Sequence, residues 1–127
     1  MRHGSAAEIA MRLSLYSDHF LEAARCLPST NEQMALPRKR LLALALEYRL
    51  KAFICAVRRG NPQSTDLSRL ANLASNCGLV LTVEQFDGIA LLSRTHAGNT
   101  ENCNTPDLEW ATLICDAIAA QASQPDG

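Results

Sequence analysis

The stretch that decides the fold is PRKRLLALALEYRLKAFICAVRR, residues 37–59. Wound into a helix, it presents apolar side chains in almost every direction. The charged residues expected to face water form one narrow stripe of Arg40, Glu47, Lys51 and Arg58, in which Glu47 and Lys51 have the favourable order for an ion pair. A helix with so little polar surface belongs at the centre of a bundle. We therefore predict that residues 37–59 form the central helix.

Helical periodicity continues on both sides of this stretch, and no segment alternates with the period of a β-strand. We predict four further helices, over about residues 5–26, 65–77, 82–96 and 105–122. The first should bury one apolar stripe, which consists of Ile9, Leu13, Tyr16, Phe20, Ala23 and Leu27. Short connections favour antiparallel neighbours. We expect an all-α protein, a single domain over residues 1–127, built as an up-and-down antiparallel bundle of four to five helices.

Several helix ends carry signals of their own. Thr82 with Gln85 matches the capping box, in which side chain and backbone satisfy each other's unpaired groups. Thr30 with Gln33 repeats this pattern before the central helix, where Pro37 is expected to restart or kink the chain. The other predicted signals are Ser64 or Thr65 as an N-cap, Gly78 after the third helix, and Thr105 with Pro106 at the start of the last helix.

Composition limits the classes of function. The chain has 127 residues, 47% hydrophobic and 20% charged, with a formal net charge of -1. A near-neutral charge excludes a global basic field that would attract nucleic acid or an anionic membrane. The longest apolar run, residues 41–46, is far too short to span a bilayer. The five cysteines include no C-x-x-C pair, so we expect free thiols, a cytoplasmic location, and neither a metal nor a cofactor.

Arg49 is the most informative single residue. It lies on the central helix opposite the charged stripe, among apolar residues. A buried guanidinium costs several kcal/mol unless it is paired and hydrogen-bonded. Arg49 therefore either pairs with a carboxylate from another helix or faces a ligand or partner.

Four more cationic residues are candidate contacts for an anion or a nucleic acid. Arg12 and His19 are two helical turns apart and share one flank of the first helix, where they could bind phosphate. The alternative is that both border the apolar stripe with their polar tips in water. Arg94 and His96 lie at the end of the fourth helix, a position that the helix dipole alone favours for cations.

Trp110 and Ile114 project from a second face of the last helix, away from the side expected to be buried. They are candidates for a subunit interface, which would make the protein a homodimer. Burial inside the monomer is the alternative.

Two stretches resemble the HEPN domains. These are LEYRLKAF, residues 46–53, which is followed by Gly60, and TDLSRL, residues 65–70, which is followed by Gly78. HEPN domains have a long E-x-x-x-K-A helix, a glycine-containing turn, then His-Asp-Leu-x-x-Leu and a glycine. The resemblance covers about residues 10–96 and implies an up-and-down helical bundle, usually a homodimer. Many members are ribonucleases of toxin–antitoxin or defence systems, and others only bind nucleotides or act as partners of nucleotidyltransferases.

The chain departs from the HEPN pattern at the residues that carry catalysis. Thr65 stands where the family has histidine. The family's late Arg-x(4–6)-His motif has no match, because Arg94 and His96 are separated by one residue. Arg12 and His19 have the required spacing but lie in the first helix. We therefore assign no catalytic residue, and a ribonuclease is the enzyme class to consider if there is one.

These observations leave three expectations for function. The first is a non-catalytic HEPN-like bundle that dimerises and binds a nucleotide or RNA at a local basic site. The second is a helical adaptor or interaction protein with no nucleic-acid role, and the third is a HEPN ribonuclease. The positions in space of five residues discriminate among them: Arg12, His19, Arg49, Arg94 and His96. Convergence in one groove or across a dimer cleft would favour nucleic acid, and scatter would favour the adaptor.

Overall fold

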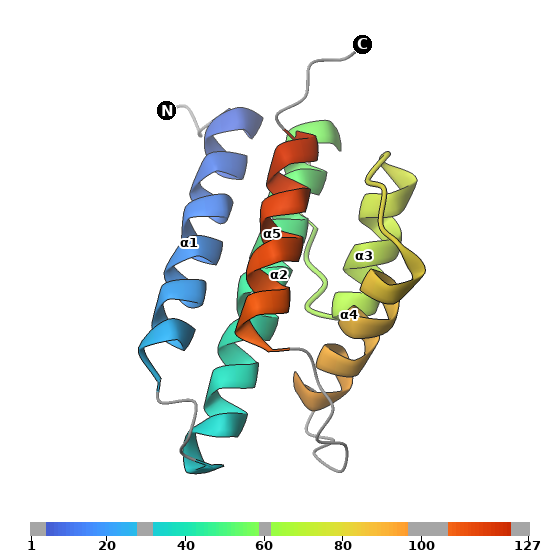
Figure 1. Ribbon diagram of the computed structural model, residues 1–127. Helices are drawn as coiled ribbons and strands as arrows, with labels where there is room; N and C mark the ends of the chain where they lie inside the picture. Colours follow the sequence, from blue (N-terminus) through green and yellow to red (C-terminus); the bar gives the residue numbers. More distant parts are fainter. Residues whose placement is uncertain (1–4, 28–31, 59–61, 97–106, 123–127) are drawn as a thin grey trace.

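Five α-helices make up the bundle in the computed structural model, which describes residues 5–27, 32–58, 62–96 and 107–122 (Figure 1). In chain order the elements are α1 (Ala6–Cys26), the short 3-10 helix η1 (Glu32–Met34), α2 (Ala35–Arg58), α3 (Leu67–Asn76), α4 (Val83–His96) and α5 (Leu108–Ala122). The described residues contain no strand. The prediction of an all-α bundle is therefore confirmed.

Helix α2 occupies the centre, as predicted for residues 37–59. Helices α1, α3, α4 and α5 all pack against it. Figure 1 shows α1 on one side of α2, with α3 and α4 on the other. The leucines at the middle of α2, Leu42, Leu46 and Leu50, are completely buried. The remaining helices thus share one core, which is built around this element.

The expected charged stripe of α2 is exposed only at its ends. Arg40 and Arg58 are exposed, but Glu47 and Lys51 are buried, which corrects the prediction that all four residues face water. Their charges compensate each other through the predicted ion pair, with Lys51 Nζ 2.9 Å from Glu47 Oε2. The ammonium group also lies 5.6 Å from the centre of the Tyr48 ring. Pairing and the ring face together allow both charged groups to leave water.

Helix α1 buries a different stripe from the one predicted. Its buried residues are Ala10, Leu13, Ser17, Leu21 and Ala24, whereas Tyr16 and Ala23 are exposed. Ser17 can occupy the core because its hydroxyl donates a hydrogen bond of 2.6 Å to the carbonyl of Ala45 on α2. The aromatic rings of Tyr16 and Phe20 instead pack on Tyr48 at the flank of the α1–α2 contact.

Two of the predicted helix-end signals are confirmed, Thr82 with Gln85 and Gly78. The Thr82 backbone N–H donates to Gln85 Oε1 at 2.8 Å, and the Gln85 N–H donates to Thr82 Oγ1 at 3.1 Å. After α3, Gly78 has a φ of +108°, which favours glycine. The N–H of Leu79 bonds the carbonyl of Ala74, and the N–H of Gly78 bonds that of Ser75. These two bonds form a Schellman motif, which ends the helix.

Two other helix starts differ from the prediction, and the predicted signals of a third lie outside the described residues. Asp66, rather than Ser64 or Thr65, caps α3, because its carboxylate accepts from the N–H groups of Ser68 and Arg69. Helix α5 begins at Leu108, and the predicted signals Thr105 and Pro106 lie outside the described residues. Thr30 also lies outside them, and α2 runs through Pro37 within its first turn, where the missing N–H costs no helical bond.

Trp110 and Ile114 pack within the monomer. Ile114 is only 2% exposed, and Trp110 is partly buried against the core. The indole lies so close to Gly88 of α4 that a Cβ there would stand 2.4 Å from Trp110 Cζ2. Ile114 therefore follows the alternative of burial inside the monomer, and the close approach of the Trp110 ring explains why position 88 is glycine.

Candidate functional site

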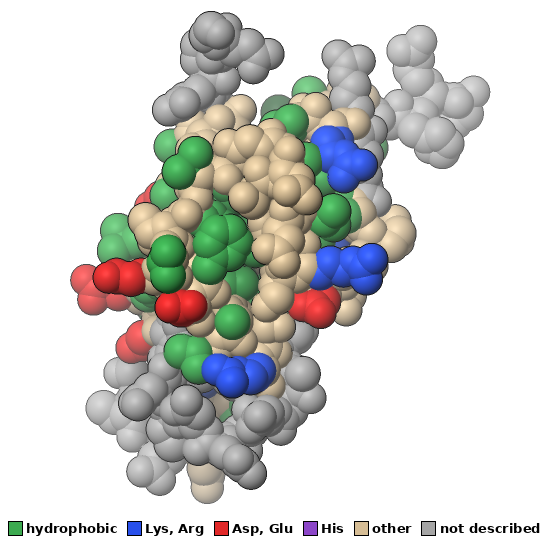
Figure 2. Space-filling model, turned by 90° about the vertical axis from the view of Figure 1, so that its right-hand side faces the viewer, with side chains coloured by type: hydrophobic (Ala, Val, Ile, Leu, Met, Phe, Trp, Pro, Cys, Tyr) green, Lys and Arg blue, Asp and Glu red, His purple; other side chains and the backbone are tan. Residues whose placement is uncertain are grey.

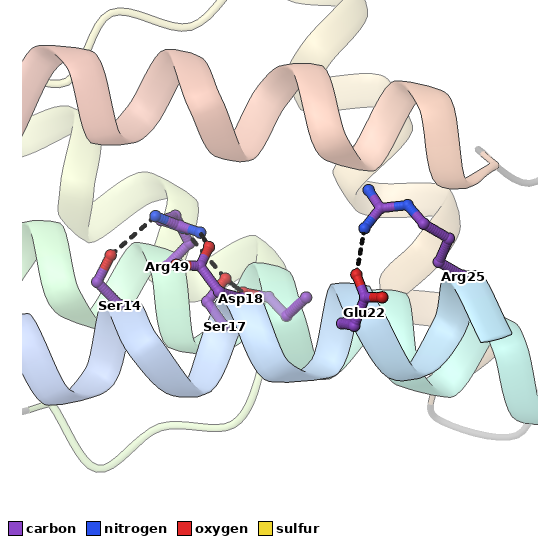
Figure 3. Close-up of polar contacts among 7 residues, drawn as sticks. Ser14, Ser17, Asp18, Glu22, Arg25 and Arg49 are labelled. Atoms are coloured by element: carbon purple, nitrogen blue, oxygen red, sulfur yellow. Dashed lines mark hydrogen bonds and ion pairs between the residues drawn. The ribbon is translucent and has the colours of Figure 1, made fainter.

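Arg49 is buried and bonded where α2 packs against α1 (Figure 3). It is 5% exposed. Its Nε donates to Ser17 Oγ at 3.1 Å, and its Nη1 donates to Ser14 Oγ at 2.8 Å. Its Nη2 donates to Asp18 Oδ1 in an ion pair, and Figure 3 shows all three partners on α1. The predicted pairing with a carboxylate from another helix is confirmed.

The same polar cluster reaches α5 through Cys115. Burial raises the pKa of this thiol to about 11, against a smaller opposing effect of the Arg49 charge and of hydrogen bonding with Ser17 and Arg49. At neutral pH the group is therefore a protonated thiol, which is a poor nucleophile. The cluster joins three helices, and it holds no activated group.

An apolar groove lies between α1 and α5, above α2, and we call it the α1–α5 groove. Its volume is about 260 Å³. It is lined by Ala7, Ala10, Met11 and Ser14 from α1, by Arg49, Ala52, Phe53 and Ala56 from α2, and by Ile118, Ala119 and Ala122 from α5. Ser14 and Arg49 are the only polar residues among these, and they bond each other. The groove therefore offers apolar contact and few free polar groups.

The other candidate cations do not join Arg49. Arg12 and His19 are exposed on α1, and at 100° per residue they lie on the side roughly opposite to the buried Leu13 and Ser17. Arg94 is exposed on α4, beyond α2 from α1 (Figure 1). His96 belongs to α4, but its side chain lies outside the described residues. The structure thus separates Arg12, Arg49 and Arg94.

Two other parts of the described surface carry basic side chains, but neither forms a basic site. Figure 2 faces the side on which α3 and α4 lie, and its Lys and Arg side chains stand among apolar and acidic ones. A cavity of about 490 Å³ near the end of α1 includes Arg25 and Arg38 in its lining. There Arg25 bonds Glu22 at 2.6 Å, and Arg38 lies 3.9 Å from Asp107.

Sequence reasoning found Arg49 but missed its partners. Ser14, Ser17 and Asp18 all lie outside the apolar stripe predicted for the first helix. A signal existed, because Ser14, Ser17 and Asp18 have the three- and four-residue spacing that places side chains on one helix face. Placing that face against Arg49 required the packing of α1 on α2, which only the structure supplies.

No comparison assigns this chain to a known group. Comparison with models of known families, with curated proteins and with solved structures finds no match. Among the described residues, no cluster of His, Cys, Asp and Glu could hold a metal ion. None of the helices in the described ranges is long and apolar enough to cross a membrane.

Proposed function

We propose that this chain is a non-catalytic helical interaction protein whose α1 and α5 helices pack against helices of a partner. The observation that supports this proposal is the α1–α5 groove, which is lined by six alanines and whose two polar residues are already bonded. Apolar grooves of this kind receive the apolar face of a helix. Small side chains allow a partner helix to approach closely.

Exposed apolar side chains lie on both helices that flank the groove, α1 and α5. Met11 lines it and is 71% exposed, and Leu15 lies one turn further along α1. Leu113 is exposed on α5. Contiguous apolar surface on a folded domain marks an interaction site more often than a scattered side chain does. These residues therefore favour the interaction function.

The chemistry of the described residues supports a non-catalytic role. Arg49 is neutralised by Asp18, and the Cys115 thiol is protonated at neutral pH. Cleavage of RNA by side chains needs a proton acceptor and a cation a few ångströms apart at one phosphate. Within a monomer, Arg12 and His19 are a described pair that shares a face, and both are exposed and line neither of the two cavities described above.

HEPN-like ancestry with nucleotide or RNA binding remains our alternative. It would use Arg12 and His19 on α1 or Arg94 on α4, which lie on different sides of α2. We also propose a cytoplasmic location, in keeping with the free thiols of the four described cysteines.

Incubation of single-stranded RNA with wild-type protein and with His19→Ala tests the alternative of nucleotide or RNA binding. Binding or cleavage that the substitution abolishes would overturn the interaction proposal.

A pair of matched variants tests the interaction function. Met11→Arg places a charge at the groove, and Val83→Arg does the same on α4, where Val83 is 76% exposed compared with 71% for Met11. Proteins captured by the wild-type chain should be purified and their direct binding measured. We expect Met11→Arg to weaken that binding about tenfold or more, equivalent to about 1.4 kcal/mol, and Val83→Arg to leave it unchanged. Equal binding by both variants would place the interaction elsewhere.

A further inference from the structure

Three exposed residues form one stripe along α1, which we call the α1 stripe: Arg12, Leu15 and His19. Their spacing of three and then four residues keeps them within about 60° on the helix surface. All three are exposed, and Leu15 is 51% exposed. The stripe therefore presents a cation, an apolar side chain and a histidine in sequence.

A complementary stripe runs along α5, and we call it the α5 stripe: Asp116, Leu113 and Glu109. Read backwards along the chain, its spacing is again three and then four residues. All three residues are exposed, and Leu113 is 65% exposed. Acidic groups thus flank a leucine at the intervals at which Arg12 and His19 flank Leu15.

The charges of both stripes lack partners within the described chain. The remaining acids of α1 are bonded: Glu8 to Ser5, Asp18 to Arg49, and Glu22 to Arg25. No hydrogen bond or ion pair among the described residues involves Arg12, His19, Glu109 or Asp116. Helix α5 carries no Lys, Arg or His of its own. Each stripe therefore offers its charge to another molecule.

The direction of the helices makes the two stripes match. Helix α1 runs antiparallel to α5 (Figure 1). A two-fold axis parallel to the helices, placed over the α1–α5 groove, would set α1 of one copy against α5 of the other while keeping them antiparallel. In an antiparallel pair, steps forward along one helix match steps backward along the other. One register therefore brings all three residue pairs together.

We propose that the helical partner is a second copy of this chain, with the α1 stripe of each copy packed on the α5 stripe of the other. Arg12 then faces Asp116 of the partner subunit, Leu15 faces Leu113 of the partner subunit, and His19 faces Glu109 of the partner subunit. The arrangement covers the α1–α5 groove and its Met11 in both copies. This inference rests on the proposed function, because it names the partner of the same surface.

Charge also decides between this pairing and its symmetric alternative. Packing α1 on α1 would bring the Arg12 and His19 side chains of the two copies together. Packing α5 on α5 would bring the Asp116 and Glu109 carboxylates of the two copies together. Like charges placed opposite each other disfavour such a contact. The α1–α5 pairing is the one in which the two stripes attract.

Charge reversal and its rescue test the arrangement. Molecular mass should be measured by light scattering and sedimentation from about 1 to about 200 µM for wild type, Arg12→Glu, Asp116→Arg and the double variant. We expect a wild-type dimer at micromolar concentration, a dissociation constant raised about tenfold in each single variant, and recovery to within about threefold in the double variant. Circular dichroism verifies that each variant stays helical, and Val83→Arg serves as the control on α4.

Two outcomes would overturn the inference. One is a wild-type monomer at every concentration, and the other is a dimer that the single variants do not weaken or that the double variant does not restore. Neither outcome decides the proposed function. That function is judged separately by the loss of a purified partner's binding in Met11→Arg and by the absence of RNA binding and cleavage that depend on His19.

Discussion

The guanidinium of Arg49 is buried, while the Asp18 carboxylate that neutralises it is 60% exposed. The cation thus sits inside the α1–α2 contact, and its counter-ion sits at the edge of that contact. The two partners of this ion pair therefore have unequal solvation. Their removal should have unequal consequences, because an exposed carboxylate left alone regains water and a buried guanidinium does not.

Asp18→Asn is expected to destabilise the protein by about 2–4 kcal/mol, because it leaves the Arg49 charge buried without an anion. Arg49→Met should cost less, since it removes the buried charge and leaves Asp18 in contact with water. Urea unfolding at neutral pH measures both free energies. If Asp18→Asn is as stable as wild type, Arg49 does not depend on that carboxylate.

The buried Glu47–Lys51 pair should show strong coupling. Glu47→Leu alone strands the Lys51 ammonium inside the protein and is expected to cost about 3 kcal/mol. Adding Lys51→Met removes the stranded charge, so the double variant should recover part of that loss. Thermal unfolding of both single variants and the double variant gives the coupling energy. Additive effects would mean that the two charges do not depend on each other.

Gly88 should resist substitution by alanine. Gly88→Ala would improve helix propensity by up to about 1 kcal/mol. Its Cβ would nevertheless lie 2.4 Å from the Trp110 ring, so we expect a net loss of about 1–3 kcal/mol. In a Trp110→Leu background the same substitution should be nearly neutral or stabilising. A thermal melt in which Gly88→Ala alone raises the melting temperature would contradict this contact.

Alkaline pH should weaken the fold through Cys115. The pKa of this thiol is raised from its ordinary value of 9.0 to about 11 in the folded protein, with burial as the main cause. Between these values the unfolded state releases a proton that the folded state keeps. The stabilising contribution is therefore complete below pH 9.0 and is lost as the pH rises towards about 11.

Cys115→Ala tests this dependence. Urea midpoints at about pH 8 and about pH 10.5 should fall further for wild type than for the variant. Burial also raises the pKa of Cys55, which both proteins retain. The comparison thus isolates Cys115, and parallel pH profiles would exclude it as the cause.

Local signals in the sequence predicted helix ends well where two side chains and their backbones bond each other, or where the backbone conformation requires glycine. Thr82 and Gln85 bond each other whatever the rest of the chain does, and Gly78 supplies a backbone conformation that few other residues adopt. The predicted cap signals before α3 did less well. Asp66 displaced Ser64 and Thr65 as the cap of α3, because any of the three side chains could accept the bonds and the local backbone selects one.

Burial of polar residues could not be predicted from periodicity. Glu47, Lys51 and Ser17 all entered the core because each finds a partner there, and the partners of Ser17 come from another helix. The two faces of α5 were ambiguous for a related reason. Whether Trp110 is covered depends on Gly88 of α4, and nothing in either segment alone connects the two.

The central position of α2 also governs how the protein opens. Because α1, α3, α4 and α5 all pack on it, no single helix can leave without exposing part of α2. Backbone amides at Leu46 and Leu50 should therefore exchange with deuterium only through global unfolding. Amides of α4 can exchange through a smaller opening, so exchange rates along the chain would separate the two processes.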